Sequence, residues 1–380
     1  MNNNLTVTFF SNFLIHQQTP FCKAMVKRLG DNFRFVATEP TDSERLDMGY
    51  RDYTDVPYVV YSYKDDNQYN EALRLGMESD VVIIGSAPDK FIKERLAANK
   101  LTFRYFERFF KEGRWRILDP RVMIAHYKQD FRYRNKNLYM LCASACTAPD
   151  CRFILSYPNK TYKWGYFPEI DTDKSIDALI EEKVSNSILW AGRQIDWKHP
   201  EYAISVAERL KDNRIPFTLN IIGDGNMHKA LKKMIYERSL QNEVTLLGSM
   251  PPDKVREHMA KSDIFLFTSD RNEGWGAVLN ESMSAGCAVV ACNEIGSVPY
   301  LIKHGENGLV YDKKDKDSLY ENVRMLIDNK DLRAKIQKNA YDTIKTVWNA
   351  DVAAERLLNL IDCINNSTQA PYTYGPCSRD

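Results

Sequence analysis

The sequence contains no long apolar run, which excludes a membrane-spanning helix. Such a helix needs about 20 consecutive apolar residues to cross the hydrocarbon core of a bilayer, and no stretch of the 380 residues approaches that length. The first residues, MNNNLTVTFF, show no basic region followed by an apolar core, so we expect no signal peptide. We therefore expect a cytoplasmic protein, with a position at the inner face of the membrane left open.

The cysteines show no spacing typical of a metal site or of a disulfide framework. The chain has 8 cysteines and no CxxC pair. We expect free thiols in a reducing compartment and no bound metal, because zinc ligands and structural disulfides usually leave paired or regular spacings. The formal net charge is +1 and charged residues make up 27%, which is ordinary for a globular protein.

Short β-rich runs alternate with helical stretches along nearly the whole chain. We expect strands at 5–10, 32–37, 57–62, 80–85, 101–106, 138–143, 187–192, 217–223, 243–248, 263–269, 288–293 and 308–312. Alternation of this kind predicts parallel sheets with helices on both faces. The sequence therefore predicts an α/β protein with two Rossmann-like domains.

The domain boundary is expected in a stretch rich in Gly, Pro and acidic residues, 162–183. We predict an N-terminal domain over residues 1–168 and a C-terminal domain over 169–348. A final amphipathic pattern predicts a helix over 349–365. The aperiodic residues 366–380 are expected to form a flexible tail.

The stretch NEGWGAVLNESMSAG, residues 272–286, places two glutamates around a Gly-rich loop that opens into a helix. Ligands of open α/β sheets bind where strand ends lead into helix N-termini. The N–H groups at 276–279 would suit a phosphate, and Glu273 and Glu281 could each accept hydrogen bonds from sugar hydroxyls. This arrangement suggests a nucleotide-sugar site. Two solvated surface carboxylates are the alternative.

Two cations follow the first strand expected in the second domain. They are Arg193 and Lys198, within GRQIDWK. An Arg fork and a Lys ammonium at a strand end would neutralise a pyrophosphate without a metal. IIGDG, residues 221–225, is a further strand that ends in a Gly turn at the same edge of the sheet.

These segments resemble, in order, the motifs of family-four glycosyltransferases. The match comprises GRQIDWK, IIGDG, SDRNEGWGAVLNESMSAGCAVVA and IGSVPYLIKHGENGLVYD, within about residues 187–312. The resemblance implies a retaining, metal-independent enzyme of the GT-B fold. Such a fold has two Rossmann-like domains that face a central cleft and a C-terminal helix that returns to the N-terminal domain.

The resemblance also implies roles for individual residues. Arg193 and Lys198 would hold the donor pyrophosphate, Glu281 the ribose hydroxyls, and Glu273 would face the transferred sugar. The expected donor-binding set is Arg193, Lys198, Gly223, Gly225, Glu273, Gly274, Trp275, Gly276, Ala277, Val278 and Glu281. The expected catalytic set is Glu273, Arg193, Lys198 and His16.

The first domain is similar to a subgroup of bacterial surface-polysaccharide transferases that carry His and Gln in the loop after the first strand. Here that loop is SNFLIHQQTPFC. His16 could donate a hydrogen bond to the donor sugar or phosphate, or could be a structural loop histidine. Glu107 and Arg104, near the end of an expected strand, are candidate acceptor contacts, and a salt-bridged surface role is the alternative for Glu107.

Residues 90–136 combine positive charge with aromatic rings. They hold 14 Lys/Arg, 5 Asp/Glu and ten aromatic residues. This composition is typical of a surface that meets nucleic acid, or an anionic membrane and its pyrophosphate-linked lipids. Because we expect a sugar-donor site in the other domain, we favour a membrane as the partner of this surface and expect no nucleic acid. An ordinary solvated face is the remaining alternative.

The sequence thus predicts transfer of a hexose-type sugar from a nucleotide-diphosphate sugar to an acceptor hydroxyl, with the anomeric configuration retained. The donor would be a UDP-, GDP- or ADP-sugar, and no cofactor is expected. The acceptor would be a glycan or a lipid-linked glycan in cell-surface polysaccharide synthesis. Two alternatives stay open: a nucleotide-sugar epimerase or hydrolase on the same fold, and a non-catalytic binding scaffold.

Overall fold

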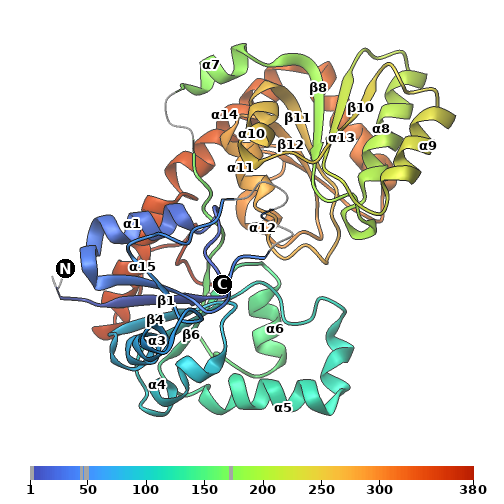
Figure 1. The fold of residues 1–380 in the computed structure, drawn as a ribbon. Helices are drawn as coiled ribbons and strands as arrows, with labels where there is room; N and C mark the ends of the chain where they lie inside the picture. Colours follow the sequence, from blue (N-terminus) through green and yellow to red (C-terminus); the bar gives the residue numbers. More distant parts are fainter. Residues whose placement is uncertain (1–3, 43–45, 47–50, 171–173) are drawn as a thin grey trace. The chain divides into compact units, whose positions relative to one another are not determined.

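The computed structural model describes residues 4–42, 46, 51–170 and 174–380 (Figure 1). Contacts divide the chain into two compact units. Of the described residues, the first unit contains those up to Pro168 together with Ala350–Asp380, and the second contains those from Glu169 to Asn349. Each unit is built on one sheet, with 7 strands in the first and 6 in the second. The predicted α/β class with two parallel-sheet domains is confirmed.

The first unit has a parallel sheet in the order β3-β2-β1-β4-β5-β6-β7. Its strands are β1 (Val7–Ser11), β2 (Phe33–Ala37), β3 (Val59–Tyr61), β4 (Val81–Ile84), β5 (Thr102–Phe106), β6 (Leu138–Cys142) and β7 (Thr161–Lys163). Its α-helices are α1 (Thr19–Leu29), α3 (Asp66–Glu78), α4 (Lys93–Ala97), α5 (Pro120–Gln129), α6 (Thr147–Phe153) and α15 (Ala350–Asn365). Short 3₁₀ helices are η1 (Gly30–Asn32), η2 (Asp89–Phe91), η3 (Arg114–Leu118) and η4 (Phe131–Tyr133). Every residue of β1 and β4 is buried, as expected for parallel strands that are covered on both faces.

The last helix, α15, belongs to the first unit, as the sequence predicts. It packs against α1, and Leu357 and Ile361 on its apolar face are fully buried. The guanidinium of Arg28 on α1 lies 2.9 Å from the carboxylate of Asp351. Burial of the apolar stripe holds this helix, and the exposed ion pair adds little.

The end of the chain differs from the flexible tail that we expected over 366–380. Cys377 and Ser378 are fully buried. The Lys163 N–H donates to Ser378 O, and the Cys377 N–H donates to Lys163 O, both at 2.8 Å. The physical reason is that β7 is an edge strand whose backbone groups need partners, and hydrogen bonding of this kind leaves no hydrophobic periodicity in the sequence.

The second unit has a parallel sheet in the order β10-β9-β8-β11-β12-β13. Its strands are β8 (Val184–Ala191), β9 (Thr218–Ile222), β10 (Val244–Gly248), β11 (Ser262–Phe267), β12 (Ala288–Cys292) and β13 (Leu309–Tyr311). Its helices are α7 (Ile176–Glu181), η5 (Asp196–Lys198), α8 (Pro200–Asp212), α9 (His228–Glu237), α10 (Pro252–Lys261), α11 (Val278–Ser284), α12 (Val298–Leu301), α13 (Lys316–Asp328) and α14 (Lys330–Thr346). Part of the predicted linker, 171–173, lies outside the described residues.

Candidate functional site

The strand order of the second sheet reverses between β8 and β11. β9 and β10 continue on one side of this pair, and β12 and β13 on the other. Loops that leave adjacent strands at such a switch point diverge and open a crevice at the carboxyl edge, where α/β proteins bind ligands. Arg193 follows β8 and Glu273 follows β11, so the predicted site residues begin at the switch point.

Two glycines let the loops after β8 and β9 pack backbone against backbone. A Cβ atom on Gly223 would lie 1.9 Å from Gly192 O, and one on Gly225 would lie 2.4 Å from Gln194 O. The Gln194 N–H donates to Asp224 O at 2.8 Å. Only glycine permits this approach, which is why both predicted glycines are required even though neither carries a side chain.

Arg193 lies between Gly192 and Gln194 in the loop after β8, and its side chain is exposed. Its guanidinium makes no ion pair or side-chain hydrogen bond in the part of the chain that the structure describes. An arginine with five N–H donors and no protein partner at a ligand edge is suited to an anion that arrives from solution.

Lys198 and Glu273, predicted as separate donor contacts, are in direct contact. Lys198 Nζ lies 2.6 Å from Glu273 Oε2, and the side chains are only 14% and 11% exposed. The Ser269 hydroxyl donates to the same carboxylate oxygen at 2.8 Å, and the Thr268 hydroxyl donates to Lys198 O at 2.7 Å. The loops after β8 and β11 are therefore joined by a largely buried ion pair.

The Gly-rich loop is anchored by Trp275, whose side chain is fully buried. Its indole N–H donates to Asn280 Oδ1 at 2.8 Å, and its ring centroid lies 5.7 Å from that of Trp348. Gly276 has φ +78°, and a Cβ atom there would lie 2.2 Å from the ring of Phe267. Trp275 was predicted to bind the donor, and the structure leaves only its backbone for such a contact.

The helix that follows this loop starts slightly later than predicted. Val278 is its first residue and Ala277 its cap. The Leu279 N–H donates to Gly276 O at 3.0 Å, so one of the four N–H groups expected at 276–279 is used within the turn.

Glu281 lies in a cavity of about 340 Å³. The residues that line it include Glu281, Arg256, Glu257, Lys261, Ser284 and Lys174. Glu281 is 7% exposed, and burial raises the pKa of its carboxyl to about 7, against the opposing effect of Arg256. A buried carboxylate beside a cation can accept hydrogen bonds from a polar ligand that replaces water.

Arg256 is a residue of this cavity that the sequence did not reveal. It lies on α10, in the run PDKVREHMAK, where its pattern is that of any charged surface helix. Ser269, which donates to Glu273, was equally unmarked, because a serine at a strand end has no distinctive spacing.

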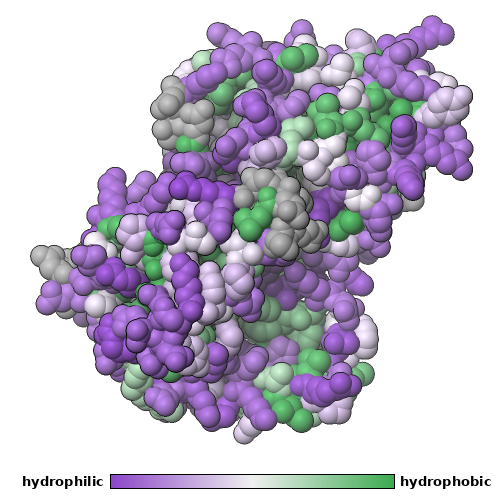
Figure 2. All heavy atoms as spheres, viewed as in Figure 1, coloured by the Kyte–Doolittle hydropathy of each residue, from purple (hydrophilic) through white to green (hydrophobic). Residues whose placement is uncertain are grey.

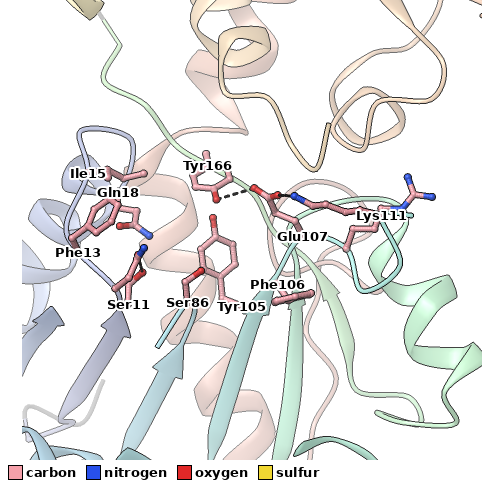
Figure 3. Close-up of a pocket in the computed structure, with 12 residues that line it drawn as sticks. Ser11, Phe13, Ile15, Gln18, Ser86, Tyr105, Phe106, Glu107, Lys111 and Tyr166 are labelled. Atoms are coloured by element: carbon pink, nitrogen blue, oxygen red, sulfur yellow. Dashed lines mark hydrogen bonds and ion pairs between the residues drawn. The ribbon is translucent and has the colours of Figure 1, made fainter. Parts of the chain in front are cut away.

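A second pocket lies in the first unit, again at a switch point. The order of this sheet reverses between β1 and β4, and a cavity of about 250 Å³ opens at the ends of β1, β4 and β5. Figure 3 shows its side chains gathered above the strand ends. They are Ser11, Asn12, Phe13, Ile15, Gln18, Ser86, Tyr105, Phe106, Glu107, Arg108, Lys111 and Tyr166.

Side-chain oxygens that accept hydrogen bonds line this pocket. The Tyr166 hydroxyl donates to Glu107 Oε1 at 2.9 Å, and Lys111 Nζ lies 3.4 Å from Glu107 Oε2. Gln18 is 8% exposed, and its buried Oε1 accepts no hydrogen bond from the described residues. Burial raises the pKa of the Tyr105 phenol well above its usual value, so this group remains protonated. A buried amide oxygen with no donor indicates a ligand that supplies one.

The other two candidates of the first unit, His16 and Arg104, are not among the residues that line this pocket. His16 is half-buried in the turn that precedes α1, two residues before Gln18. Arg104 makes a bidentate pair with Asp89 at 2.8 and 2.9 Å, and its Nε lies 3.6 Å from Asp130. An acceptor that contacted Arg104 would have to compete with these carboxylates.

Comparison with known proteins agrees with the arrangement of the second unit. The family model described as "Glycosyl transferases group 1" matches residues 171–343. An uncharacterized glycosyltransferase of Methanocaldococcus jannaschii is 31% identical over 169 residues, which is 44% of this chain and 46% of that protein. The amylovoran biosynthesis glycosyltransferase of Erwinia amylovora is 27% identical over 205 residues, 53% of this chain and 49% of that protein. The chain thus spans about half the length of these curated relatives.

The likeness to solved structures covers nearly the whole chain. HepE of Anabaena, in complex with UDP, superposes with a TM-score of 0.69 at 15% identity, over 94% of this chain and 100% of that one. At this identity the likeness shows the fold, which is GT-B. In the described part of the chain, no helix has both the length and the apolar character that a membrane crossing requires.

Proposed function

Because residues 171–343 form a group 1 glycosyltransferase domain, we propose that the chain is a retaining glycosyltransferase. It moves a hexose-type sugar from a nucleotide-diphosphate sugar to an acceptor hydroxyl. The observation that carries this proposal is the set of charges at the β8/β11 switch point, where an unpartnered Arg193 lies in the loop next to the Lys198–Glu273 pair.

The diphosphate of the donor binds to Arg193 and Lys198. Arg193 provides a fork for two phosphate oxygens. The pyrophosphate, with one negative charge on each phosphate, competes with Glu273 for the Lys198 ammonium. The carboxylate that is released then accepts hydrogen bonds from hydroxyls of the transferred sugar. The two cations then stabilise the charge that develops on the leaving nucleoside diphosphate, and this stabilisation needs no reorganisation during the reaction.

The rest of the donor follows the loop and helix after β11. The backbone of Gly274–Val278 meets the sugar and phosphate, since the Trp275 side chain is buried elsewhere. Glu281 accepts the ribose hydroxyls within its cavity. Structures of the Anabaena neighbour hold UDP and UDP-glucose, so a UDP-sugar is the first donor to test, with GDP- and ADP-sugars beside it.

The pocket of the first unit receives the acceptor. Gln18 Oε1, which has no donor among the described residues, and the Glu107 carboxylate would both accept hydrogen bonds from the acceptor, and the aromatic rings beside them suit the hydroxyls and apolar faces of a sugar. His16, in the same loop as Gln18, helps to position the reacting sugars. The acceptor is a glycan or a lipid-linked glycan, in keeping with the relative from amylovoran biosynthesis.

A panel of UDP-, GDP- and ADP-sugars tests the proposal in two steps. Thermal unfolding identifies the donor, because a ligand that binds only the folded protein raises the melting temperature. That donor is then incubated with glycan and lipid-linked acceptors, and the products are analysed by mass spectrometry and NMR. A glycosidic product with the donor's anomeric configuration is expected.

Two other outcomes would replace the proposal. Free sugar or epimerised donor as the main product, with acceptors present, would identify a hydrolase or an epimerase. Absence of stabilisation by every donor in the panel would leave a binding scaffold.

A further inference from the structure

The 3₁₀ helix η3 and the helix α5 carry an unusual set of exposed apolar side chains, and we refer to residues 114–129 as the η3–α5 surface. Trp115, Leu118, Met123, Ile124 and Tyr127 are 61%, 81%, 54%, 48% and 57% exposed. α5 has no buried residue along its 10 positions. Figure 2 shows hydrophobic spheres gathered beside hydrophilic ones over α5, at the bottom of the view. A cluster of large apolar side chains in water marks an interaction site.

α5 is held in place without using these residues. Asp119 caps its first turn by accepting from the Arg121 N–H at 2.9 Å, and Pro120 is its first residue. On the inner side, His126 packs against the rings of Phe109 and Phe110, at centroid distances of 5.2 and 5.4 Å. Met123 and Tyr127 are one turn apart and more than half exposed, although the Tyr127 ring also stacks on that of Phe131 at a centroid distance of 5.9 Å.

Two cations lie on the same stripe of α5 as Ile124. Arg121 and Lys128 are three before and four after Ile124, a spacing that places all three on one helical stripe. The Arg121 side chain is 93% exposed. Lys128, Arg132 and Arg134 form no ion pair with any described residue. From residue 111 to 134 the sequence has seven Lys/Arg and three Asp/Glu.

This combination fits one kind of partner. Helices that lie in the plane of an anionic membrane surface combine apolar and aromatic side chains with flanking Lys and Arg. A nucleic acid would use the cations but would leave aliphatic residues such as Leu118, Met123 and Ile124 without partners.

We propose that the η3–α5 surface docks on an anionic lipid bilayer. Trp115, Leu118, Met123 and Ile124 enter the headgroup region, while Arg121 and Lys128 meet lipid phosphates. The acceptor pocket lies in the same unit and close in sequence, since Lys111 lines the pocket and Arg114 begins η3. Docking therefore presents the pocket to a headgroup sugar or phosphate. The bilayer contact itself needs no donor and does not depend on sugar transfer.

Sedimentation of the full chain with vesicles tests the proposal. One set of vesicles contains phosphatidylcholine alone and the other contains phosphatidylcholine with an equal amount of phosphatidylglycerol. We expect binding to the anionic set, weakened by salt, and little binding to the neutral set. Each removed cation should weaken binding about fivefold, so R121Q/K128Q should lose about 25-fold at low ionic strength.

Variants separate the apolar from the electrostatic contribution. L118S/I124S should bind anionic vesicles more weakly than the unchanged chain, and a lower salt concentration should not restore this binding. The matched control is K229Q/K232Q on α9 of the second unit, where both lysines are exposed, and it should bind as the unchanged chain does. Circular dichroism and thermal melting verify that each variant is folded.

The proposal is overturned if the unchanged chain ignores anionic vesicles at low salt, or if the α9 control loses as much binding as R121Q/K128Q. Vesicle binding that persists in both η3–α5 variants would also overturn the proposal. A protein would then be the partner to test for this surface. Stabilisation by the nucleotide is measured on the same samples. It should be equal in L118S/I124S and the unchanged chain, so failure of membrane docking is distinguishable from failure of the sugar-transfer proposal.

Discussion

Glu281→Gln should stabilise the ligand-free protein while it weakens binding of the nucleotide. The buried carboxyl has a pKa of about 7, raised from 4.5 chiefly by burial. A pKa raised in the folded state means that the folded chain binds the proton more tightly than the unfolded chain does. Stability from this group is therefore complete below pH 4.5 and is lost as the pH rises through 7.

The size of the effect follows from the shift. Each pKa unit corresponds to about 1.4 kcal/mol, so ionised Glu281 costs about 3 kcal/mol above pH 7. An amide of the same shape removes that cost, although it also loses the attraction of Arg256, so this value is an upper bound. For a unit of this size the melting temperature should rise by roughly 6–12 °C at pH 8, with little change at pH 5.

Differential scanning calorimetry at both pH values, with and without UDP, measures this prediction. With UDP the variant should gain less stability than the unchanged chain, because an amide accepts fewer hydrogen bonds from ribose hydroxyls. Glu257→Gln is the control. It lines the same cavity but is exposed, and its pKa is lowered by Lys254, so no pH-dependent gain is expected. A Glu281→Gln protein that melts at or below the unchanged temperature at pH 8 would refute the reasoning.

Three further predictions concern the Gly-rich loop, the Lys198–Glu273 pair and the pocket of the first unit. Gly276→Ala combines positive φ with a clash and should lower the free energy of unfolding in urea by about 3 kcal/mol or more, roughly the sum of strain and overpacking. Gly248 has positive φ but open space around it, so the control Gly248→Ala should lower it by about 1 kcal/mol. Lys198→Met should cost about 2–4 kcal/mol because the buried Glu273 carboxylate keeps the Ser269 hydroxyl but loses its cation. Adding Glu273→Gln should restore part of that loss in a double-mutant cycle; independent, additive losses would contradict the ion pair. Glu107→Gln should raise the acceptor KM roughly tenfold and leave UDP binding unchanged, and an effect on UDP affinity would instead assign Glu107 to the donor.

The strand pattern and the glycines of the second unit were readable from the sequence because each has a local physical cause. Buried parallel strands leave short apolar runs, and a loop that packs against another backbone requires glycine, as at Gly223 and Gly225. Position at strand ends and the family resemblance predicted Lys198 and Glu273 as donor contacts, but their mutual contact depends on how two strands far apart in sequence are ordered in the sheet. No local pattern records that order.

Other features depend on long-range contacts and could not be predicted. Trp275 follows a glycine in the Gly-rich loop after β11, and its ring packs in the core against Trp348, 73 residues further on. Arg256 enters the Glu281 cavity from a helix with an ordinary charged pattern. Cys377 is buried against β7 by backbone hydrogen bonds, and such bonds are independent of side-chain type.

The central claim is that a diphosphate binds at the β8/β11 switch point. The most direct test is calorimetric titration of UDP into three proteins: the unchanged chain, Arg193→Ala and Lys232→Ala. The Arg193 side chain makes no ion pair or hydrogen bond with any residue that the structure describes. Its removal should therefore weaken UDP binding by about 1.5–3 kcal/mol, the scale of a charge-assisted hydrogen bond, without lowering the melting temperature of the ligand-free chain. Lys232→Ala, an exposed change on α9, should leave the affinity as it was. Equal affinity for UDP in all three proteins would contradict the account.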